Sequence, residues 1–372
     1  MRAVRVHAKR NAFLAEEIPV PDIGPGEVLV QVHSVGLSRG LVSVWLFTDM
    51  IKLLPATLGH EIAGVVASVG AGVTNVAEGD RVHVYPPLGC GKTSCDGCAA
   101  GDESRCPSFA MIGYAVFGPE GMSVYERYHN GGMAEYVRVP AANLEILPAG
   151  MSFQAGCKLT TASISVRALS TASQIVPGGT LLVTGATGAN GSLAVSCAPL
   201  FGFERVIAVA NHRTALDRLA KTFPQIHAVI AMEELAADWK KSGGLTAAIK
   251  QAGGVDALLD FTPIEPFVIQ QSLPALNRHG CAILMAGNPS LIQVNYLDVM
   301  THGLRIWGAP HATRADVRLT LSMVARGHLD IEPLVTHRFP LESAADAMKA
   351  IMLRKDSPGL VVLDVKEEQH AA

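Results

Sequence analysis

The sequence predicts an α/β protein with a β-rich part and a part built on a doubly wound parallel sheet. At 372 residues the chain is too long for one compact core and fits two domains. Residues 1 to about 155 contain short, Val-rich stretches bounded by Gly, Pro or Asp, which are typical of barrel-like strands. After about residue 156, strand-like and helix-like segments alternate, which indicates a parallel sheet with helices on both faces.

The composition narrows the class of partner. Hydrophobic residues make up 49% of the chain and charged residues 17%, as in soluble globular proteins. The net charge is −3 without a long run of one sign, so neither nucleic acid nor an anionic membrane is expected as a partner. No stretch approaches the roughly 18 uninterrupted apolar residues of a membrane span, and the N-terminus lacks a secretory signal pattern. We therefore expect a cytoplasmic protein that acts on a small-molecule substrate.

The elements of the β-rich part come first along the chain. "EVLVQVHSVGL" (27–37), "HEIAGVVASVG" (60–70) and "DRVHVYPP" (80–87) are the clearest predicted strands. The alternating part then begins with the strand and Gly-rich turn of "GTLLVTGATGANG". Further strands are predicted at 205–210, 227–232, 255–262 and 281–287, with helices at 213–223 and 267–277. The alternation fades near residue 309, and the tail ends with a helix at 342–355 and a strand at 359–365.

The turn "VTGATGANG" is the first candidate binding site. Gly185, Gly188 and Gly191 stand at intervals of three between a strand and a helix. Glycines there let the backbone approach a pyrophosphate at the helix N-terminus, where amide groups are unpaired. The spacing differs from G-x-G-x-x-G, so the strand and helix around it carry the prediction against an ordinary turn. Ala189 and Asn190 complete the predicted phosphate-binding segment.

The end of the second predicted strand bears on the choice of coenzyme. An NAD site usually has Asp or Glu here to accept hydrogen bonds from the ribose 2′-hydroxyl. This chain has Asn211, His212 and Arg213 instead. A missing carboxylate beside a cation favours the 2′-phosphate of NADP(H) over NAD(H), although Arg213 also suits a solvated first turn of a helix.

Four of the seven cysteines predict a structural zinc site. Cys90, Cys95, Cys98 and Cys106 form the pattern C-x4-C-x2-C-x7-C. Four thiolates at about 2.3 Å from the ion make a closed, tetrahedral zinc site without catalytic function. Disulfides and free thiols are the alternatives, and both are less favoured in a long cytosolic chain.

Taken together, these segments resemble the medium-chain dehydrogenase/reductase superfamily, which includes zinc-containing alcohol dehydrogenases and their quinone-reductase-like relatives. The resemblance rests on "GHEIAGVVASVGAGV", "GDRV", the cysteine loop, "GGMAEYVRVP", "GATGANG" and "THRFPLESAADA". It implies a GroES-like catalytic domain from residues 1–158 and 309–372, with a structural zinc lobe at 90–106. It also implies a Rossmann NADP(H)-binding domain at 159–308 and a homodimer or homotetramer.

The resemblance also implies positions for a catalytic zinc. Such a zinc usually takes Cys from "G-x-C-x-[ST]-D", His from "G-H-E" and a Cys ahead of the coenzyme domain. His60 and Glu61 stand in "GHE", and Cys157 stands four residues before Thr161, which matches the nicotinamide-contacting Thr of the family. Two readings stay open: a three-ligand zinc site, or a core histidine beside a small buried thiol.

The first ligand position departs from the family pattern. Ser38 stands where the family has Cys, Gly40 where a hydroxyl relays the substrate proton, and Leu41 where an acid supports the His ligand. A neutral hydroxyl is a far poorer zinc ligand than a thiolate, and loss of an outer carboxylate also weakens metal binding. The sequence is therefore compatible both with a three-ligand catalytic zinc site and with a site that holds no metal.

The expected function is hydride transfer between NADP(H) and a small organic substrate. With zinc, the metal would polarise a carbonyl or alkoxide as a Lewis acid. Without zinc, the acceptor would be an activated C=C bond, and water or a side chain would protonate it. Candidate proton donors are the tyrosines in or beside one long connection: Tyr114, Tyr125, Tyr128 and Tyr136. The third possibility is a non-catalytic NADP(H)-binding protein.

Overall fold

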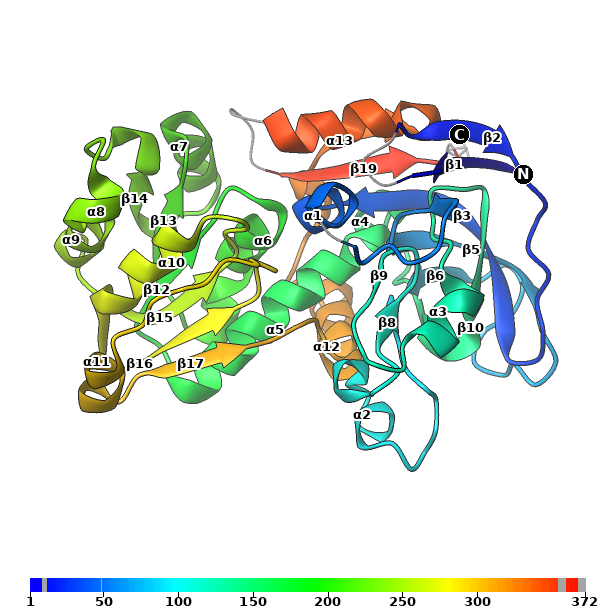
Figure 1. Cartoon of the computed structure of the whole chain (residues 1–372), viewed down its shortest axis with the longest axis horizontal. Coiled ribbons are helices and arrows are strands. Elements are labelled where there is room, and N and C mark those ends of the chain that lie inside the picture. Colours follow the sequence, from blue (N-terminus) through cyan, green and yellow to red (C-terminus); the bar gives the residue numbers. More distant parts are fainter. Residues whose placement is uncertain (9–11, 48, 354–358, 367–372) are drawn as a thin grey trace. The chain divides into compact units, whose positions relative to one another are not determined.

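The computed structural model describes residues 1–8, 12–47, 49–353 and 359–366, and these form two compact units (Figure 1). The first unit contains Met1–Thr160, Thr313–Leu353 and the segment that starts at Leu360. The second unit contains Thr161–Ala312 and, among the later described residues, Gly359. Each unit is described by itself below.

The first unit is built on a mixed, mainly antiparallel sheet of seven strands. Their order is β11-β6-β5-β3-β19-β18, and β10 pairs with β3. The strands are β3 (Glu27–Leu37), β5 (Glu61–Val69), β6 (Arg81–Val84), β10 (Tyr136–Pro140), β11 (Leu144–Ile146), β18 (Val335–Pro340) and β19 (Leu360–Asp364). Because β19 pairs with β3, segments from both ends of the chain build one sheet.

Two small sheets and several helices complete the first unit. The sheets are β2-β1-β4, with β1 (Arg2–Val6), β2 (Leu14–Glu17) and β4 (Ala56–Thr57), and β7-β8-β9, with β7 (Pro87–Leu88), β8 (Ala110–Met111) and β9 (Ala115–Val116). The helices are α1 (Arg39–Phe47), α2 (Asp96–Ala99), α3 (Met122–Tyr128), α4 (Phe153–Cys157), α12 (Arg314–Ala325) and α13 (Ala344–Leu353). Helix α5 (Leu159–Ile175) starts in this unit and continues into the second.

The second unit has a parallel sheet of six strands in the order β14-β13-β12-β15-β16-β17. These strands are β12 (Thr180–Thr184), β13 (Arg205–Ala210), β14 (Ile226–Ala231), β15 (Val255–Asp260), β16 (Leu276–Leu284) and β17 (Arg305–Gly308). In chain order this is 3-2-1-4-5-6, the order of a dinucleotide-binding sheet. The predicted α/β class with a doubly wound, Rossmann-type sheet is thus confirmed.

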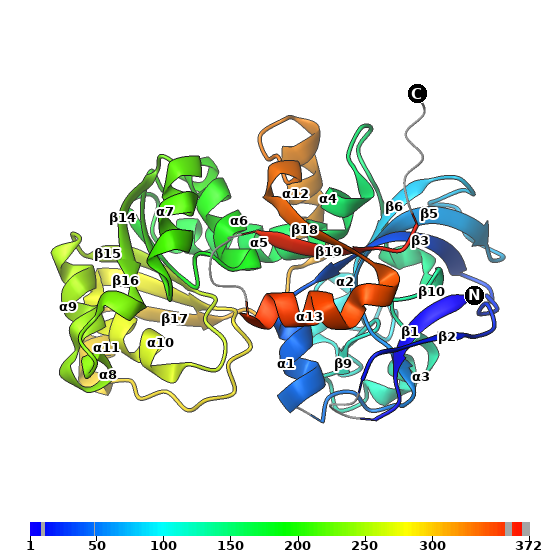
Figure 2. The same cartoon turned by 90° about the horizontal axis from the view of Figure 1, so that it is seen from above.

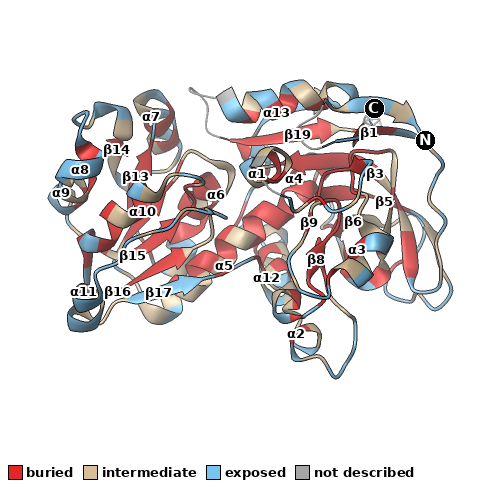
Figure 3. Ribbon diagram, viewed as in Figure 1, coloured by how far each residue is buried: buried red, intermediate tan, exposed pale blue. Residues whose placement is uncertain are grey.

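Helices cover both faces of the parallel sheet. They are α6 (Ala189–Cys197), α7 (Arg213–Thr222), α8 (Trp239–Ser242), α9 (Gly244–Gln251), α10 (Pro266–Ser272) and α11 (Tyr296–His302). Figure 2 shows α6 and α7 on one side of the sheet and α8 and α10 on the other. The central strands are buried over most of their length: in β15 all residues except Asp256 are buried, and in β16 the buried apolar part is residues 280–283 (Figure 3). In the described segments, no helix combines the length and the apolar character needed to cross a bilayer.

A buried ion pair ties the cysteine loop of the first unit to helix α12. Glu103 is 3% exposed, and its carboxylate lies 2.7 Å from Arg314 Nε and accepts a 2.9 Å hydrogen bond from the Tyr85 hydroxyl. The Arg314 guanidinium also lies 4.8 Å from the centre of the Tyr85 ring. The backbone N–H of Arg314 donates to Gly101 O at 3.0 Å. The loop that carries the cysteines is thus held by a residue far along the chain.

We predict that Arg314→Met lowers the free energy of unfolding by about 3 kcal/mol, because the Glu103 carboxylate would stay buried without its cation. Arg318→Met is the matched control on the same helix, since the Arg318–Glu145 pair is 3.2 Å long and its Arg side chain is 68% exposed. That control should cost about 0–1 kcal/mol. Urea denaturation of the full chain measures both values, and equal losses in the two variants would contradict the prediction.

Candidate functional site

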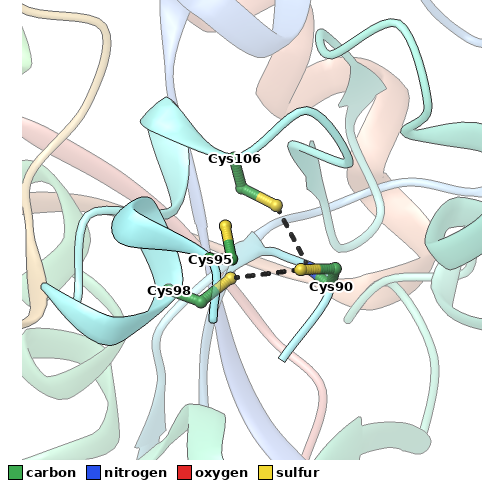
Figure 4. Close-up of side chains that lie close together, drawn as sticks. All are labelled: Cys90, Cys95, Cys98 and Cys106. Carbon is green, nitrogen blue, oxygen red and sulfur yellow. Dashed lines mark hydrogen bonds between the residues drawn. The ribbon is translucent and has the colours of Figure 1, made fainter. Parts of the chain in front are cut away.

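The four cysteine sulfurs converge in the first unit. All four Sγ atoms lie within 4.8 Å of one another, and the Sγ atoms of Cys90 and Cys98 are 3.9 Å apart. Tetrahedral zinc with sulfurs at about 2.3 Å requires sulfur–sulfur distances of about 3.8 Å. Figure 4 shows the side chains turned toward one another around a common centre, from the loop and helix that contain them. The residues present therefore fit one zinc ion.

The surroundings of the cluster act on the thiols in two directions: hydrogen-bond donors stabilise the thiolate form, and burial opposes it. The backbone N–H groups of Cys90 and Ser108 donate to Cys106 Sγ at 3.3 Å and 3.4 Å. The backbone N–H of Cys98 is the main reason why the pKa of the Cys95 thiol is lowered to about 7. Burial raises the pKa of the Cys98 thiol to about 12. Donors aimed at sulfur favour the charged form that zinc requires.

The glycine turn of the second unit lies at the carboxyl end of β12, directly before α6. Gly185 has φ +66°, and its carbonyl accepts a 2.9 Å hydrogen bond from Gly188 N–H. A Cβ atom on Gly191 would lie 2.3 Å from Gly185 O, so the close packing of the turn requires glycine there. No side chain caps the start of α6 at Gly188. Its first amide groups are thus available for an anion.

One buried atom in this turn has no partner in the described structure. Asn190 Oδ1 is buried without a hydrogen bond to any described residue. An unpaired acceptor is costly unless a ligand or water supplies a donor, and a ribose hydroxyl would do so. The predicted segment from Gly185 to Gly191 therefore fits a dinucleotide. Thr161, the other predicted coenzyme residue, lies buried in α5, and its carbonyl accepts a hydrogen bond of 3.2 Å from Ser165.

A carboxylate that sequence reasoning missed reaches the end of β13. Glu233 follows β14, and it accepts a 2.7 Å hydrogen bond from the Arg213 N–H and lies 2.9 Å from His212 Nδ1. The Arg213 side chain pairs with Glu234 at 2.9 Å. A cavity of about 330 Å³ lies beside these residues, and it is lined by Asn211, His212, Met232, Glu233, Trp239, Lys240 and Glu265. The available signal was the pair of acids directly after the third predicted strand.

A second missed residue dominates the predicted catalytic region. Lys158 is completely buried, and its Nζ lies 2.8 Å from Glu61 Oε2 and 2.8 Å from Leu37 O. Glu61 in β5 faces Gly36 in β3, where a Cβ atom would lie 2.3 Å from Glu61 Oε2 and 2.9 Å from Lys158 Nζ. The room for this ion pair thus depends on glycine at position 36. The sequence signal was a lysine in an apolar segment, because lysine is seldom buried without a partner.

The other predicted catalytic residues have ordinary structural partners or none. His60 Nε2 is 3.9 Å from Glu61 Oε1, and His60 Nδ1 is buried without a partner among the described residues. Burial lowers the pKa of His60 to about 4; Glu61 opposes this shift and Lys158 adds to it. The Cys157 thiol donates to Gln154 O at 3.2 Å, and burial raises its pKa. Ser38 Oγ accepts the Leu41 N–H at 3.4 Å, at the start of α1.

These residues do not fit a catalytic zinc. In the part of the chain that the structure describes, the cysteine cluster is the only group of three or more His, Cys, Asp or Glu side chains close enough for one metal ion. The Glu61 carboxylate accepts a hydrogen bond from the Lys158 ammonium group, and the Cys157 thiol donates one to Gln154 O in its own helix. Neither group offers zinc a free anionic ligand.

One of the four tyrosines lies in this region. A Cβ atom on Gly40 would lie 3.0 Å from the Tyr114 hydroxyl, and the Tyr114 and His60 ring centres are 4.4 Å apart. Desolvation raises the pKa of Tyr114, and the Glu61 carboxylate adds to the shift. The other three hydroxyls lie elsewhere: Tyr125 is buried without a described partner, Tyr128 donates to Glu27, and Tyr136 accepts from Gln31.

Comparisons with known proteins identify the family of the chain. The sequence model of the alcohol dehydrogenase GroES-like domain matches residues 24–149. An alcohol dehydrogenase of Geobacillus stearothermophilus is 28% identical over 98% of this chain and 100% of its own length. A sorbitol dehydrogenase of Gallus gallus is 28% identical over 93% of this chain and 92% of its own.

The fold gives the same result. The crystal structure of an NAD-dependent alcohol dehydrogenase superposes with a TM-score of 0.82 at 27% identity, over 98% of this chain and 100% of that one. The similarity thus extends over both units and is not confined to the matched domain. The chain therefore belongs to the medium-chain dehydrogenase/reductase superfamily and is an alcohol dehydrogenase-like oxidoreductase.

Proposed function

We propose that this protein transfers a hydride between NADP(H) and a small carbonyl or alcohol substrate. The observation that carries the proposal is the uncapped turn before α6, with the unpaired Asn190 acceptor beside it. Residues 159–308 would bind the coenzyme, with Thr161 at the nicotinamide, and residues 1–158 and 309–372 would bind the substrate. When bound, the nicotinamide supplies the hydride chemistry, and the protein binds and orients the reactants. A homodimer or homotetramer is part of the proposal.

The names of the relatives support an alcohol or polyol as the substrate class. They include alcohol dehydrogenase, sorbitol dehydrogenase and L-threonine 3-dehydrogenase. Reduction of an activated C=C bond is the second candidate, and the serine and glycine at the positions of the lost zinc ligand and hydroxyl favour it. An assay of the purified chain with alcohols, aldehydes, ketones and enones separates the two. A chain that binds coenzyme but converts none of these would be the non-catalytic alternative.

The coenzyme prediction concerns Arg213 and Glu233. We expect a higher kcat/KM with NADPH than with NADH. Arg213→Ala should lower the ratio of kcat/KM with NADPH to kcat/KM with NADH, because it removes a partner of the 2′-phosphate. Glu233→Gln should raise this NADPH/NADH ratio, since it removes a carboxylate that would repel the 2′-phosphate. Steady-state kinetics with both coenzymes measures the ratio in the wild type and in each variant.

NAD(H) is the alternative that one observation favours. Glu233 stands where a carboxylate could accept hydrogen bonds from a ribose 2′-hydroxyl, and Glu234 already neutralises Arg213. The wild type would then prefer NADH, and Glu233→Gln would shift the preference toward NADPH. That result would show that Glu233 takes the role of the Asp or Glu that an NAD site usually has at the end of β13.

The structural zinc is proposed at Cys90, Cys95, Cys98 and Cys106. Cys98→Ser should abolish stoichiometric zinc binding and lower the temperature of unfolding, because three thiolates cannot close the tetrahedron. Cys281→Ser is the matched control, since Cys281 is buried in β16 of the other unit. Zinc content by elemental analysis decides the point, and an unchanged zinc content in Cys98→Ser would refute the assignment.

Tyr114 is proposed as the proton donor, because its hydroxyl stands beside Gly40, where the family has a side-chain hydroxyl. A tyrosine phenol is protonated at neutral pH, as a donor must be. Tyr114→Phe should lower kcat by about 100-fold. Tyr125→Phe is the control, because that hydroxyl is buried without a described partner, and it should leave kcat unchanged. Unaltered turnover by Tyr114→Phe would remove Tyr114 from the mechanism.

A further inference from the structure

We infer that Lys158 takes the place of the catalytic metal: its ammonium group is the fixed positive charge beside Glu61, and zinc does not bind there. The zinc part of the inference depends only on the geometry of the first unit. Its extension to catalysis rests on the proposed hydride transfer.

The position of the ammonium group is the first argument. Lys158 directly follows Cys157 at the end of α4, and its side chain reaches the β3–β5 pair. There Nζ lies 2.8 Å from Glu61 Oε2, so the carboxylate that a metal would need is already neutralised. A divalent cation at the same carboxylate would also be repelled by the ammonium charge at short range. The lysine and a zinc ion therefore exclude each other.

The second argument is that the backbone is shaped for the ion pair. Gly36 leaves the space into which the Glu61 carboxylate and Lys158 Nζ extend, because a Cβ atom there would lie within 3 Å of both. The Leu37 carbonyl supplies a second acceptor for the ammonium group. The ammonium group thus has two acceptors, the Glu61 carboxylate and the Leu37 carbonyl. Three separate segments of the unit hold the charge in one place.

The third argument is energetic. A buried ion pair contributes little to stability, and apolar residues of similar volume often serve equally well or better. Packing alone therefore gives no reason for a completely buried Lys158 beside a completely buried Glu61. A lost metal gives such a reason, because the remaining carboxylate needs a compensating charge and Lys158 supplies it. Lys158 is then a positioning residue that holds Glu61 and, beside it, His60.

The first test counts zinc in purified wild type, Ser38→Cys and the double variant Ser38→Cys/Lys158→Ala, by elemental analysis after exposure to excess zinc and desalting. Ser38→Cys should hold the same zinc content as the wild type, because the ammonium group still blocks the site. The double variant should hold one additional zinc per chain, since it has a new thiolate and no competing cation. Replacement by cobalt should then give a thiolate-to-cobalt absorption band that the wild type lacks at this site.

Three results would overturn the inference: two zinc ions in the wild type, an additional zinc in Ser38→Cys alone, or a folded double variant without an additional zinc. The zinc contents of the wild type and of Ser38→Cys test the inference even if the double variant does not fold. The zinc contents of the two variants are compared with that of the wild type, so these two comparisons do not depend on whether the cysteine cluster is loaded.

The second test concerns the charge itself. Lys158→Ala should lower kcat by up to about 100-fold, as displacement of a positioning group does. Methylammonium should restore part of this activity, whereas tetramethylammonium, which has no N–H donor, should not. Equal effects of both salts would show that Lys158 acts only in packing. If the wild type converts no substrate, the proposed function fails, and the zinc content still decides whether Lys158 replaces the metal.

Discussion

The register between β3 and β5 is the constraint on which the candidate catalytic region depends. Strand β3 pairs with β5, β10 and β19, and it places Gly36 directly opposite Glu61. Side chains alternate between the two faces of a sheet, so a slip of one residue would move Glu61 away from Lys158. The strand then ends at Leu37, whose carbonyl binds the lysine, and Ser38 follows at the start of α1. One pairing thus positions the acid, the space beside it and the acceptor for the cation.

Local pattern was enough to predict the fold and the contiguous sites. The apolar run at 27–37 coincides with β3, and the predicted helix at 213–223 with α7, because both signals lie within one element. The cysteine cluster was predictable because short spacing alone brings its sulfurs close. The glycine turn was predictable because the strand and the helix that flank it have their own periodicity.

The chemistry between distant residues was not predictable from the sequence. Lys158 and Glu61 are 97 positions apart, and the approach of Tyr114 to Gly40 likewise depends on how separate segments pack. Glu233 reaches His212 only because β14 lies next to β13 in the sheet. Such contacts depend on strand order and register, and no window of the sequence contains both partners. The absent thiolate at Ser38 could be read from the chain, whereas the cation that compensates for it could not.

The pairing of β19 with β3 has a consequence for the order in which the chain folds during synthesis. All six strands of the parallel sheet lie within Thr161–Ala312, so this sheet can form once β17 has left the ribosome. The first unit cannot complete its sheet at that stage, because its central strand β3 lacks its neighbour β19 until residues 360–364 have been made. The cysteine loop waits as well, since Arg314, which fastens it, is made more than 200 residues after Glu103. During that interval the four thiols are not yet enclosed by the finished unit, so a metal ion from the cell can reach them before the chain is complete.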